Sequence, residues 1–286
     1  MYQYARSSNQ TSFRSNAPLS NDQIAQYAPS VLAESAHESR GERYSFIPTI
    51  QVLDGLRAEG FQPFEVRQTR VKDQGRREHT KHLVRLRHAS TIEANVGEEV
   101  PEIILINSHD GSSSYQLLAG FFRFVCSNGL IAGDVCNDIR VRHSGNVVDD
   151  VIEGSFRVLD NVEEIGSRIQ TYKSISLKPE EQSLFANAAL QLRWDEGKAP
   201  VEAERVLRAR RWDDRKDDLW TTFNRVQENL VKGGVSGRAS TGRRLTTRAV
   251  GGVNENVKLN RALWTLADGL AQLKQGVIDV EELVAA

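Results

Sequence analysis

The stretch from Phe61 to His88 reads FQPFEVRQTRVKDQGRREHTKHLVRLRH and sets the pattern for the first half of the chain. Apolar and polar residues alternate from Phe61 to Lys72 and again from Lys81 to His88, as they do in half-buried strands. The residues DQGRR between the two runs favour a turn. The stretch therefore predicts two neighbouring antiparallel strands that are rich in arginine and lysine.

More strands follow this pair, and a helix precedes it. EIILIN (Glu102–Asn107) is nearly all apolar, which is typical of a central strand, and Tyr115–Val125 and Asp138–His143 are expected to be further strands. Ile47–Gly60 has apolar residues spaced by three and ends at a glycine, which predicts a helix. Residues 41–146 are thus expected to form a β-rich core, an antiparallel β-meander with a preceding helix.

Helical spacing replaces the alternation in the second half of the chain. Apolar residues recur every three or four positions in the segments 147–172, 179–194, 201–211, 217–231 and 256–275. Residues 232–252 are rich in glycine and arginine without a hydrophobic period, which predicts a mobile basic loop. Residues 1–40 are expected to form a flexible N-terminal arm, with a short helix over Asn21–Glu34. Strands followed by a helical region, residues 147–286, indicate an α+β fold.

Charge is unevenly distributed along a chain whose formal net charge is −1. Residues 67–88 contain eight Lys or Arg residues and two acidic ones, while residues 225–248 contain six and one. A local basic stripe on a neutral protein is a common feature of polyanion binding. Side chains on one strand face repeat about every 6.5–7 Å, near the phosphate spacing of an extended single strand. The alternatives are a solvated sheet face with arginines that protect an edge, and a plain surface loop.

Two cysteines in 286 residues argue for a reducing compartment rather than a disulfide framework. The first 16 residues contain no apolar run that would indicate a secretory signal. No stretch approaches the roughly 18 apolar residues of a membrane span. We therefore expect a soluble, cytoplasmic protein without a membrane partner.

The turn His109-Asp110-Gly111 is the first candidate for chemistry. Adjacent His and Asp ligate metal in some phosphohydrolases, but Cys126, Cys136 and His143 lack the close spacing that pre-organises a metal site. Asp-Gly also reverses the chain between strands, and short polar side chains satisfy turn amides. We favour a structural turn over a polar ligand contact, and both over a metal-dependent hydrolase.

Other catalytic signatures are missing from the sequence. Ser112–Ser114 do not stand in a Gly-x-Ser-x-Gly elbow, and no Walker loop is present. The sequence therefore predicts a protein that is not an enzyme and that has no cofactor. Trp212, Trp220 and Trp264 are expected to anchor the helices in the core. One helix carries the polar group Asn224, Gln227, Glu228 and Asn229, in which Asn224 and Glu228 share a face. The group fits either a buried hydrogen-bond network or a ligand contact.

Two segments resemble a known family. NSHDGSSSYQLLAGFFRFVCSNGLI (Asn107–Ile131) and the segment Leu219–Leu270 resemble the phage- and plasmid-borne proteins grouped as domain of unknown function 932. The similarity extends over roughly residues 40–275, and the family name implies no catalytic residues. More distantly, a helix followed by a basic meander is similar to the core of single-strand annealing recombinases of the Redβ, RecT and Erf kind.

The two basic clusters and these resemblances imply a DNA-binding protein of a phage or plasmid, which anneals single strands in recombination without ATP. The expected partners are single-stranded DNA and further copies of the chain in a homo-oligomer. The alternative is a non-enzymatic interaction protein that blocks host defence or binds an acidic partner. The residues expected to contact nucleic acid are Arg67, Arg70, Lys72, Arg76, Arg77, Lys81, Arg85, Arg87, Arg238, Arg243, Arg244 and Arg248.

Overall fold

The chain forms two compact units in the computed structural model, which describes most of its residues. The described residues are 11–41, 44, 46–91, 99–123, 128–131, 139–141, 147–160, 162–239 and 241–277. The first unit contains residues 1–120, 138–159 and 251–253, and the second contains residues 121–137, 160–250 and 254–286. Among the residues described, no helix has the length and apolar character to cross a membrane.

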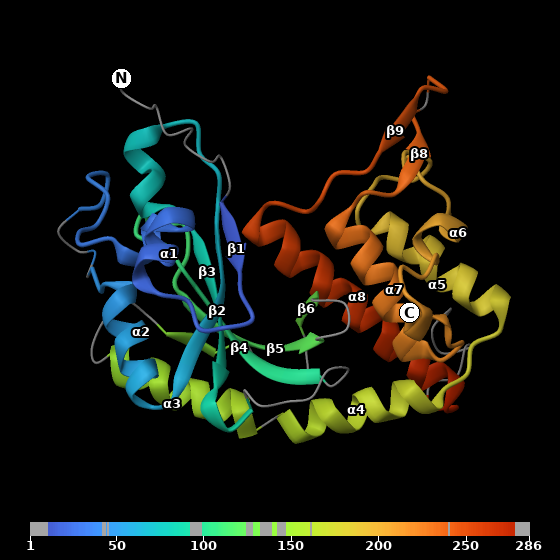
Figure 1. Cartoon of the computed structure of the whole chain (residues 1–286), viewed down its shortest axis with the longest axis horizontal. Coiled ribbons are helices and arrows are strands. Elements are labelled where there is room, and N and C mark those ends of the chain that lie inside the picture. The colour runs from blue at the N-terminus through green and yellow to red at the C-terminus, as the bar shows by residue number, and fades with distance from the viewer. Residues whose placement is uncertain are drawn as a thin grey trace. The chain divides into compact units, whose positions relative to one another are not determined.

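An antiparallel meander is the centre of the first unit. Within the described residues, seven strands form one sheet in the order β1-β2-β3-β4-β5-β6, with β7 beside β5 (Figure 1). The strands are β1 (Ser12–Arg14), β2 (Phe61–Gln68), β3 (His82–His88), β4 (Glu99–Asn107), β5 (Tyr115–Arg123), β6 (Asn128–Ile131) and β7 (Ile139–Val141). β5 runs on into the second unit, to which β6 belongs. Val66 pairs with Val84, and Val84 pairs with Leu105, so the register follows the apolar pattern of the sequence.

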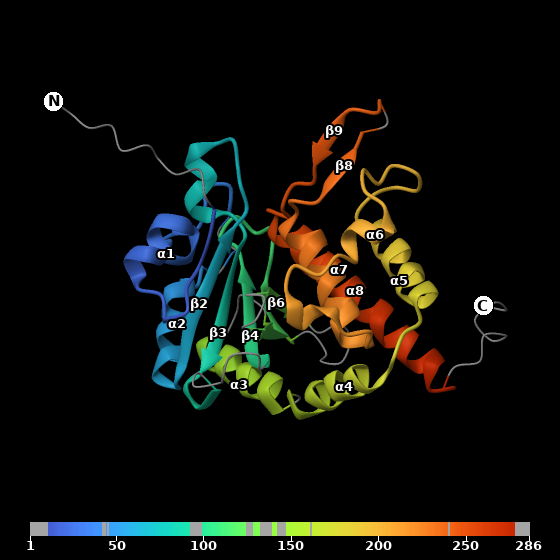
Figure 2. The same cartoon turned by 45° about the vertical axis from the view of Figure 1, so that its right-hand side comes forward.

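Helices cover the apolar side of these strands. The helix α1 (Asn21–Tyr27) begins at a capping box formed by Ser20 and Gln23, and the 3-10 helix η1 (Pro29–Leu32) follows it. α2 (Thr49–Ala58) runs beside β2 and buries Val52, Leu53 and Leu56 (Figures 1 and 2). Leu53 and Leu56 belong to the apolar positions spaced by three that predicted the helix, while Ile50 is only half-buried. α3 (Val147–Asp160) approaches the sheet closely at Gly154, where a Cβ atom would lie 2.7 Å from Leu117. Two further 3-10 helices, η2 (Gln74–His79) and η3 (Ala89–Thr91), follow β2 and β3.

The second unit is helical. Its helices are α4 (Val162–Ser174), α5 (Pro179–Gln191), α6 (Ala203–Val206), the 3-10 helix η5 (Trp212–Arg215), α7 (Leu219–Lys232) and α8 (Val253–Lys274). α7 is buried along nearly its whole length, and α8 lies beside it in both views (Figures 1 and 2). Trp220, Phe223, Trp264 and Tyr172 form an aromatic core with ring centroids 5.5–6.5 Å apart.

The expected α+β class, with its antiparallel meander, preceding helix and helical C-terminal region, is confirmed. Several elements differ from the sequence prediction. The segment expected to be a flexible arm contributes β1 and α1, and Phe13 of β1 stacks on Tyr27 with ring centroids 4.5 Å apart. The helix expected over 147–172 is two helices, and that expected over 201–211 is the four-residue α6. Such short or polar elements depend on tertiary contacts rather than on hydrophobic periodicity.

The expected mobile loop 232–252 contains a two-stranded hairpin. β8 (Ser236–Arg238) pairs with β9 (Arg244–Thr246) in antiparallel register. The sequence pattern gave no signal for these strands because three-residue strands leave too little room for alternation.

Candidate nucleic-acid interface

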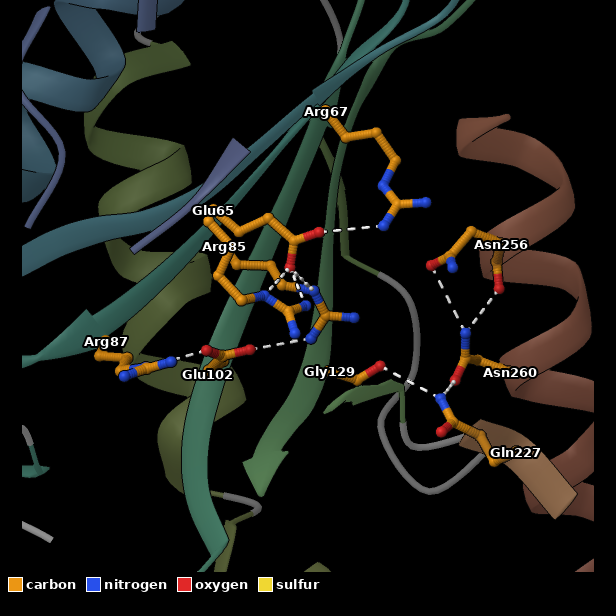
Figure 3. Close-up of polar contacts among 10 residues, drawn as sticks. Glu65, Arg67, Arg85, Arg87, Glu102, Gly129, Gln227, Asn256 and Asn260 are labelled. Atoms are coloured by element: carbon orange, nitrogen blue, oxygen red, sulfur yellow. Dashed lines mark hydrogen bonds and ion pairs between the residues drawn. The ribbon is translucent and has the colours of Figure 1, made fainter. Parts of the chain in front are cut away.

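The arginines of the meander fall into two groups, and the first group is buried. Arg85 and Arg87 on β3 are both 2% exposed. Arg85 Nη1 lies 2.8 Å from Glu102 Oε2, and Arg87 Nε lies 2.9 Å from Glu102 Oε1 (Figure 3). The guanidinium of Arg87 also lies 4.2 Å from the ring centroid of Phe64. These two guanidinium groups are therefore engaged inside the protein and do not reach solvent.

Three arginines surround the buried carboxylate of Glu65 on β2, and one of them is Arg85. Arg14 Nε donates to Glu65 Oε2 at 2.8 Å, and Arg67 Nη2 donates to Oε1 at 3.1 Å. Arg85 Nε lies 3.4 Å from Oε2, so Arg85 bridges Glu65 and Glu102 (Figure 3). Burial disfavours the ionised form of Glu65, but the surrounding guanidinium groups outweigh it and lower the pKa to about 2. The two acids thus pair with four arginines and offset part of the positive charge at this part of the sheet.

The second group of meander cations lies in the segment between β2 and β3. Arg70, Lys72 and Arg76 are exposed, while Arg77 and Lys81 are half-buried. Arg76 Nη2 lies 3.8 Å from Asp110 Oδ2, a loose ion pair at the surface. Burial lowers the pKa of Lys81, and Asp110 opposes that shift. Among the eight cations of the meander that were predicted to contact nucleic acid, the exposed ones lie in this segment, where an external anion can reach them.

The arginine hairpin, residues 233–250, holds the second predicted cluster. The cluster consists of Arg238, Arg243, Arg244 and Arg248. All four side chains are exposed, and none of them forms an ion pair within the described part of the chain. Arg238 and Arg244 are register partners on β8 and β9. Like charges directly opposite each other across a strand pair destabilise it. A bound anion between these two guanidinium groups would relieve the repulsion.

A groove of about 620 Å³ lies beside the arginine hairpin. Its lining includes Arg205, Arg238 and Arg244, together with Glu202 and the backbone of Pro200. Arg205 is exposed, and it is not among the residues that the sequence predicts to contact nucleic acid. The sequence gives little indication of a basic site at Arg205, because the surrounding segment from Glu202 to Arg211 contains both acidic and basic residues.

Backbone contacts fix the arginine hairpin against the second unit. The Arg238 amide donates to the Pro200 carbonyl at 2.8 Å, and a Cβ atom on Gly237 would lie 1.9 Å from that same oxygen. Gly233 has φ +64°, and a Cβ there would lie 2.5 Å from the Arg248 carbonyl carbon. Arg193 Nη2 donates to the Arg248 carbonyl at 2.6 Å. These contacts fix the backbone of the hairpin, while the side chains of its arginines are exposed to solvent.

The polar residues of α7 support this end of the second unit. Asn229 Nδ2 donates to the carbonyls of Val206 and Arg208 at 2.7 and 2.9 Å, and Gln227 Nε2 donates to Asn260 Oδ1 at 2.8 Å (Figure 3). Glu228 pairs with Arg211 and Lys232. Of the two alternatives for this helix face, the buried hydrogen-bond network is the one that the structure shows.

The NSHDGSSSY motif forms a turn and part of a buried polar cluster. The Ser112 amide donates to Asp110 Oδ1 at 3.0 Å, and Gly111 has φ +77°, so the predicted turn between β4 and β5 is confirmed. The cluster centres on Thr49 Oγ1, which lies 3.0 Å from His82 Nε2 and 3.1 Å from His109 Nε2. Asn107 and Tyr115 also contact Thr49 Oγ1, at 3.0 and 3.3 Å.

This polar cluster is closed to solvent. Thr49, His82, Asn107, His109 and Tyr115 are all fully buried, so no substrate reaches them in this structure. Burial lowers the pKa of His82 to about 4 and raises the pKa of the Tyr115 hydroxyl. Within the described ranges, no three His, Cys, Asp or Glu side chains are grouped as metal ligands. Cys126, Cys136 and His143 lie outside those ranges.

Trp212 was wrongly predicted to be a core residue. Its side chain is 76% exposed, whereas Trp220 and Trp264 are 2% and 1% exposed. Spacing along a helix cannot identify it because η5 is a single 3-10 turn.

The comparisons with known proteins agree on one family. Two proteins of Escherichia coli (strain K12), UPF0380 protein YafZ and UPF0380 protein YfjQ, are each 51% identical to this chain over 257 residues. Each alignment covers 90% of this chain and 93% of the relative. No solved structure matches the chain significantly. Residues 36–264 match the family model described as Domain of unknown function (DUF932), and the chain therefore belongs to that family.

Proposed function

We propose that this chain binds single-stranded DNA through its exposed arginines and anneals complementary strands without ATP. The contacts are made to phosphates, so binding does not depend on base sequence. The arginine hairpin is the principal contact, and Arg70, Lys72 and Arg76 between β2 and β3 supply a second.

The observation that carries this proposal is the cross-strand pair Arg238 and Arg244. The two exposed residues are register partners on neighbouring strands, and neither forms an ion pair to a carboxylate of the described residues. Arg238 Nη1 donates to the Gly242 carbonyl at 3.3 Å. Guanidinium groups bind phosphate oxygens in a bidentate manner, and the close backbone packing at Gly237 limits movement of β8 beneath them.

Two further observations support annealing rather than an ATP-driven activity. The sequence contains no Walker loop, and pairing of complementary strands requires no nucleotide hydrolysis. The order of elements, a helix followed by an antiparallel meander, also resembles the core of the Redβ, RecT and Erf annealing proteins, although the arginines of β3 are buried in this chain. Self-assembly of the chain into an oligomer is part of this proposal, because one copy offers few phosphate contacts.

Fluorescence anisotropy with a labelled single-stranded oligonucleotide tests the binding. The logarithm of the affinity should fall linearly with the logarithm of the salt concentration, with a slope of about −0.7 per phosphate contact. The variant with alanine at all four hairpin positions should bind more weakly and lose up to about 3 units of slope. The four changes are Arg238→Ala, Arg243→Ala, Arg244→Ala and Arg248→Ala.

A matched control removes four exposed cations elsewhere in the second unit. It carries Lys178→Ala, Lys198→Ala, Arg208→Ala and Lys258→Ala. This control should keep the wild-type slope, because its cations lie outside the hairpin. Absence of binding at low salt would contradict the proposal, as would equal loss in both variants. Complete competition by polyglutamate would favour an acidic protein partner instead.

A further inference from the structure

Trp212 is an exposed tryptophan on a firmly held turn. Aromatic side chains stabilise proteins when they are buried. Because 76% of the Trp212 side chain is exposed, it contributes little to the stability of the fold. Leu184 is another large apolar residue with high exposure, at 67%, but it projects from the regular helix α5. The turn that carries Trp212 is by contrast fixed by a set of partly buried ion pairs.

These ion pairs join η5 to two other elements of the second unit. Asp214 Oδ1 accepts from Arg123 Nη1 at 2.7 Å, and Asp214 Oδ2 accepts from Arg211 Nε at 3.0 Å. Arg211 also pairs with Glu228 of α7. Because Arg211 and Asp214 stand on either side of Trp212 in the sequence, their contacts hold the backbone from which the indole projects.

A cation accompanies the indole ring. The guanidinium carbon of Arg215 lies 4.4 Å from the ring centroid of Trp212. Arg215 and its neighbour Lys216 are both exposed, and so are the acidic residues Asp213 and Asp217. An aromatic face with cations beside it is the combination that binds unpaired nucleobases and their phosphates.

Trp212 is also linked to the arginine hairpin through α7. Arg210, two residues before Trp212, donates from Nε to Asn229 Oδ1 at 2.8 Å and from Nη2 to the Gly233 carbonyl at 2.5 Å. The next residue, Gly234, begins the hairpin pairing by donating to the Thr247 carbonyl at 2.8 Å. The same end of α7 therefore anchors both the phosphate-binding hairpin and the segment that leads to Trp212.

We infer that Trp212 is a stacking site for an unpaired nucleobase of the bound strand. This inference rests on the proposed function and adds a base contact to its phosphate contacts. Stacking is tolerant of base identity, so Trp212 distinguishes single strands from duplex without reading sequence. Paired bases in a duplex cannot offer their faces to the indole.

The test compares Trp212→Ala and Trp212→Phe with the wild-type chain in oligonucleotide binding. Trp212→Ala should lower the affinity for single-stranded DNA by roughly 5- to 150-fold per stacked base, with an unchanged salt slope because no charge is lost. Trp212→Phe should recover most of the affinity. Leu184→Ala, which removes another exposed apolar side chain from the same unit, should bind like the wild type.

An abasic oligonucleotide separates stacking from phosphate binding. It should bind the wild type and Trp212→Ala equally. If single-stranded DNA binds with the expected salt dependence but Trp212→Ala has wild-type affinity, the stacking inference is overturned and the proposed function stands. If the wild type binds no single-stranded DNA at low salt, the proposed function fails and the inference fails with it.

Discussion

Arg85 Nη1 lies 2.8 Å from Glu102 Oε2, and neither side chain is more than 2% exposed. Arg87 shares the same carboxylate through its Nε at 2.9 Å. The two guanidinium groups thus share one buried acid, and Arg85 also lies 3.4 Å from Glu65 Oε2. An arginine-rich strand that resembles a nucleic-acid surface in the sequence is here part of the protein's interior.

Glu102→Gln should destabilise the protein strongly. The substitution keeps the shape of the side chain but leaves Arg87 in the interior without its carboxylate and Arg85 with Glu65 alone. Loss of a buried ion-pair partner costs about 3–5 kcal/mol. Urea denaturation followed by circular dichroism measures the free energy of unfolding. The control is Glu153→Gln, an exposed position on α3, which should stay within about 0.5 kcal/mol of the wild type. Equal stability of the two variants would contradict the buried ion network.

The exposed and buried meander cations should have opposite effects on binding and stability. Arg70→Ala with Lys72→Ala should lower the affinity for single-stranded DNA and reduce the salt slope by up to about 1.4, while stability changes by less than about 1 kcal/mol. Arg85→Met should destabilise the fold and leave the slope unchanged in the folded protein. Anisotropy and urea denaturation of the same preparations check both. If Arg85→Met reduced the salt slope of binding and the double variant of Arg70 and Lys72 did not, the buried arginine would have to contact DNA.

Stability should depend on pH through His82. Burial lowers its pKa to about 4, while the unfolded chain has a pKa of about 6.5, so the unfolded state binds more protons between these values. The contribution of His82 is therefore complete above about pH 6.5 and is lost as the pH falls toward 4, in total on the order of 3 kcal/mol. Thr49 and Ser30 contact its two ring nitrogens, and the Thr80 carbonyl and Asp110 partly oppose the shift of the pKa.

Urea denaturation at several pH values measures this dependence. The His82→Gln variant should be less stable at pH 7 and should show a flatter decline between pH 6.5 and 4. His88→Gln, at a half-buried position at the other end of β3, should keep the wild-type slope. An unchanged slope for His82→Gln would show that other groups cause the decline.

Gly237→Ala should loosen the arginine hairpin. The added methyl group would meet the Pro200 carbonyl oxygen at 1.9 Å, so β8 has to move away, at a cost of about 1–3 kcal/mol. Trypsin should then cleave faster after the hairpin arginines, and thermal denaturation should show a lower midpoint. Gly251→Ala is the control because a Cβ there meets nothing within 4 Å. Equal rates of cleavage in the two variants would argue against the close contact.

The larger elements of the fold could be predicted from the sequence. Alternation of apolar and polar residues predicted β2 and β3, and a run of apolar residues predicted β4. Apolar residues spaced by three or four predicted α2, α5, α7 and α8. β1, β6 and the hairpin strands have three or four residues and mixed polarity, so their pairing partners define them rather than their own patterns. Asp110-Gly111 was correctly predicted as a turn because only a few residue types accept positive φ.

The sequence by itself determined the α+β class, the turn at Asp110-Gly111 and the position of the two basic clusters along the chain. Tertiary structure decided which of those cations meet water. Strand register places Glu65 directly opposite Arg85, and Glu102 reaches Arg85 and Arg87 from β4, so these charges are neutralised in the interior. The hairpin register instead places Arg238 opposite Arg244 at the surface. Local sequence cannot distinguish the two cases, because the partner of each arginine belongs to another strand.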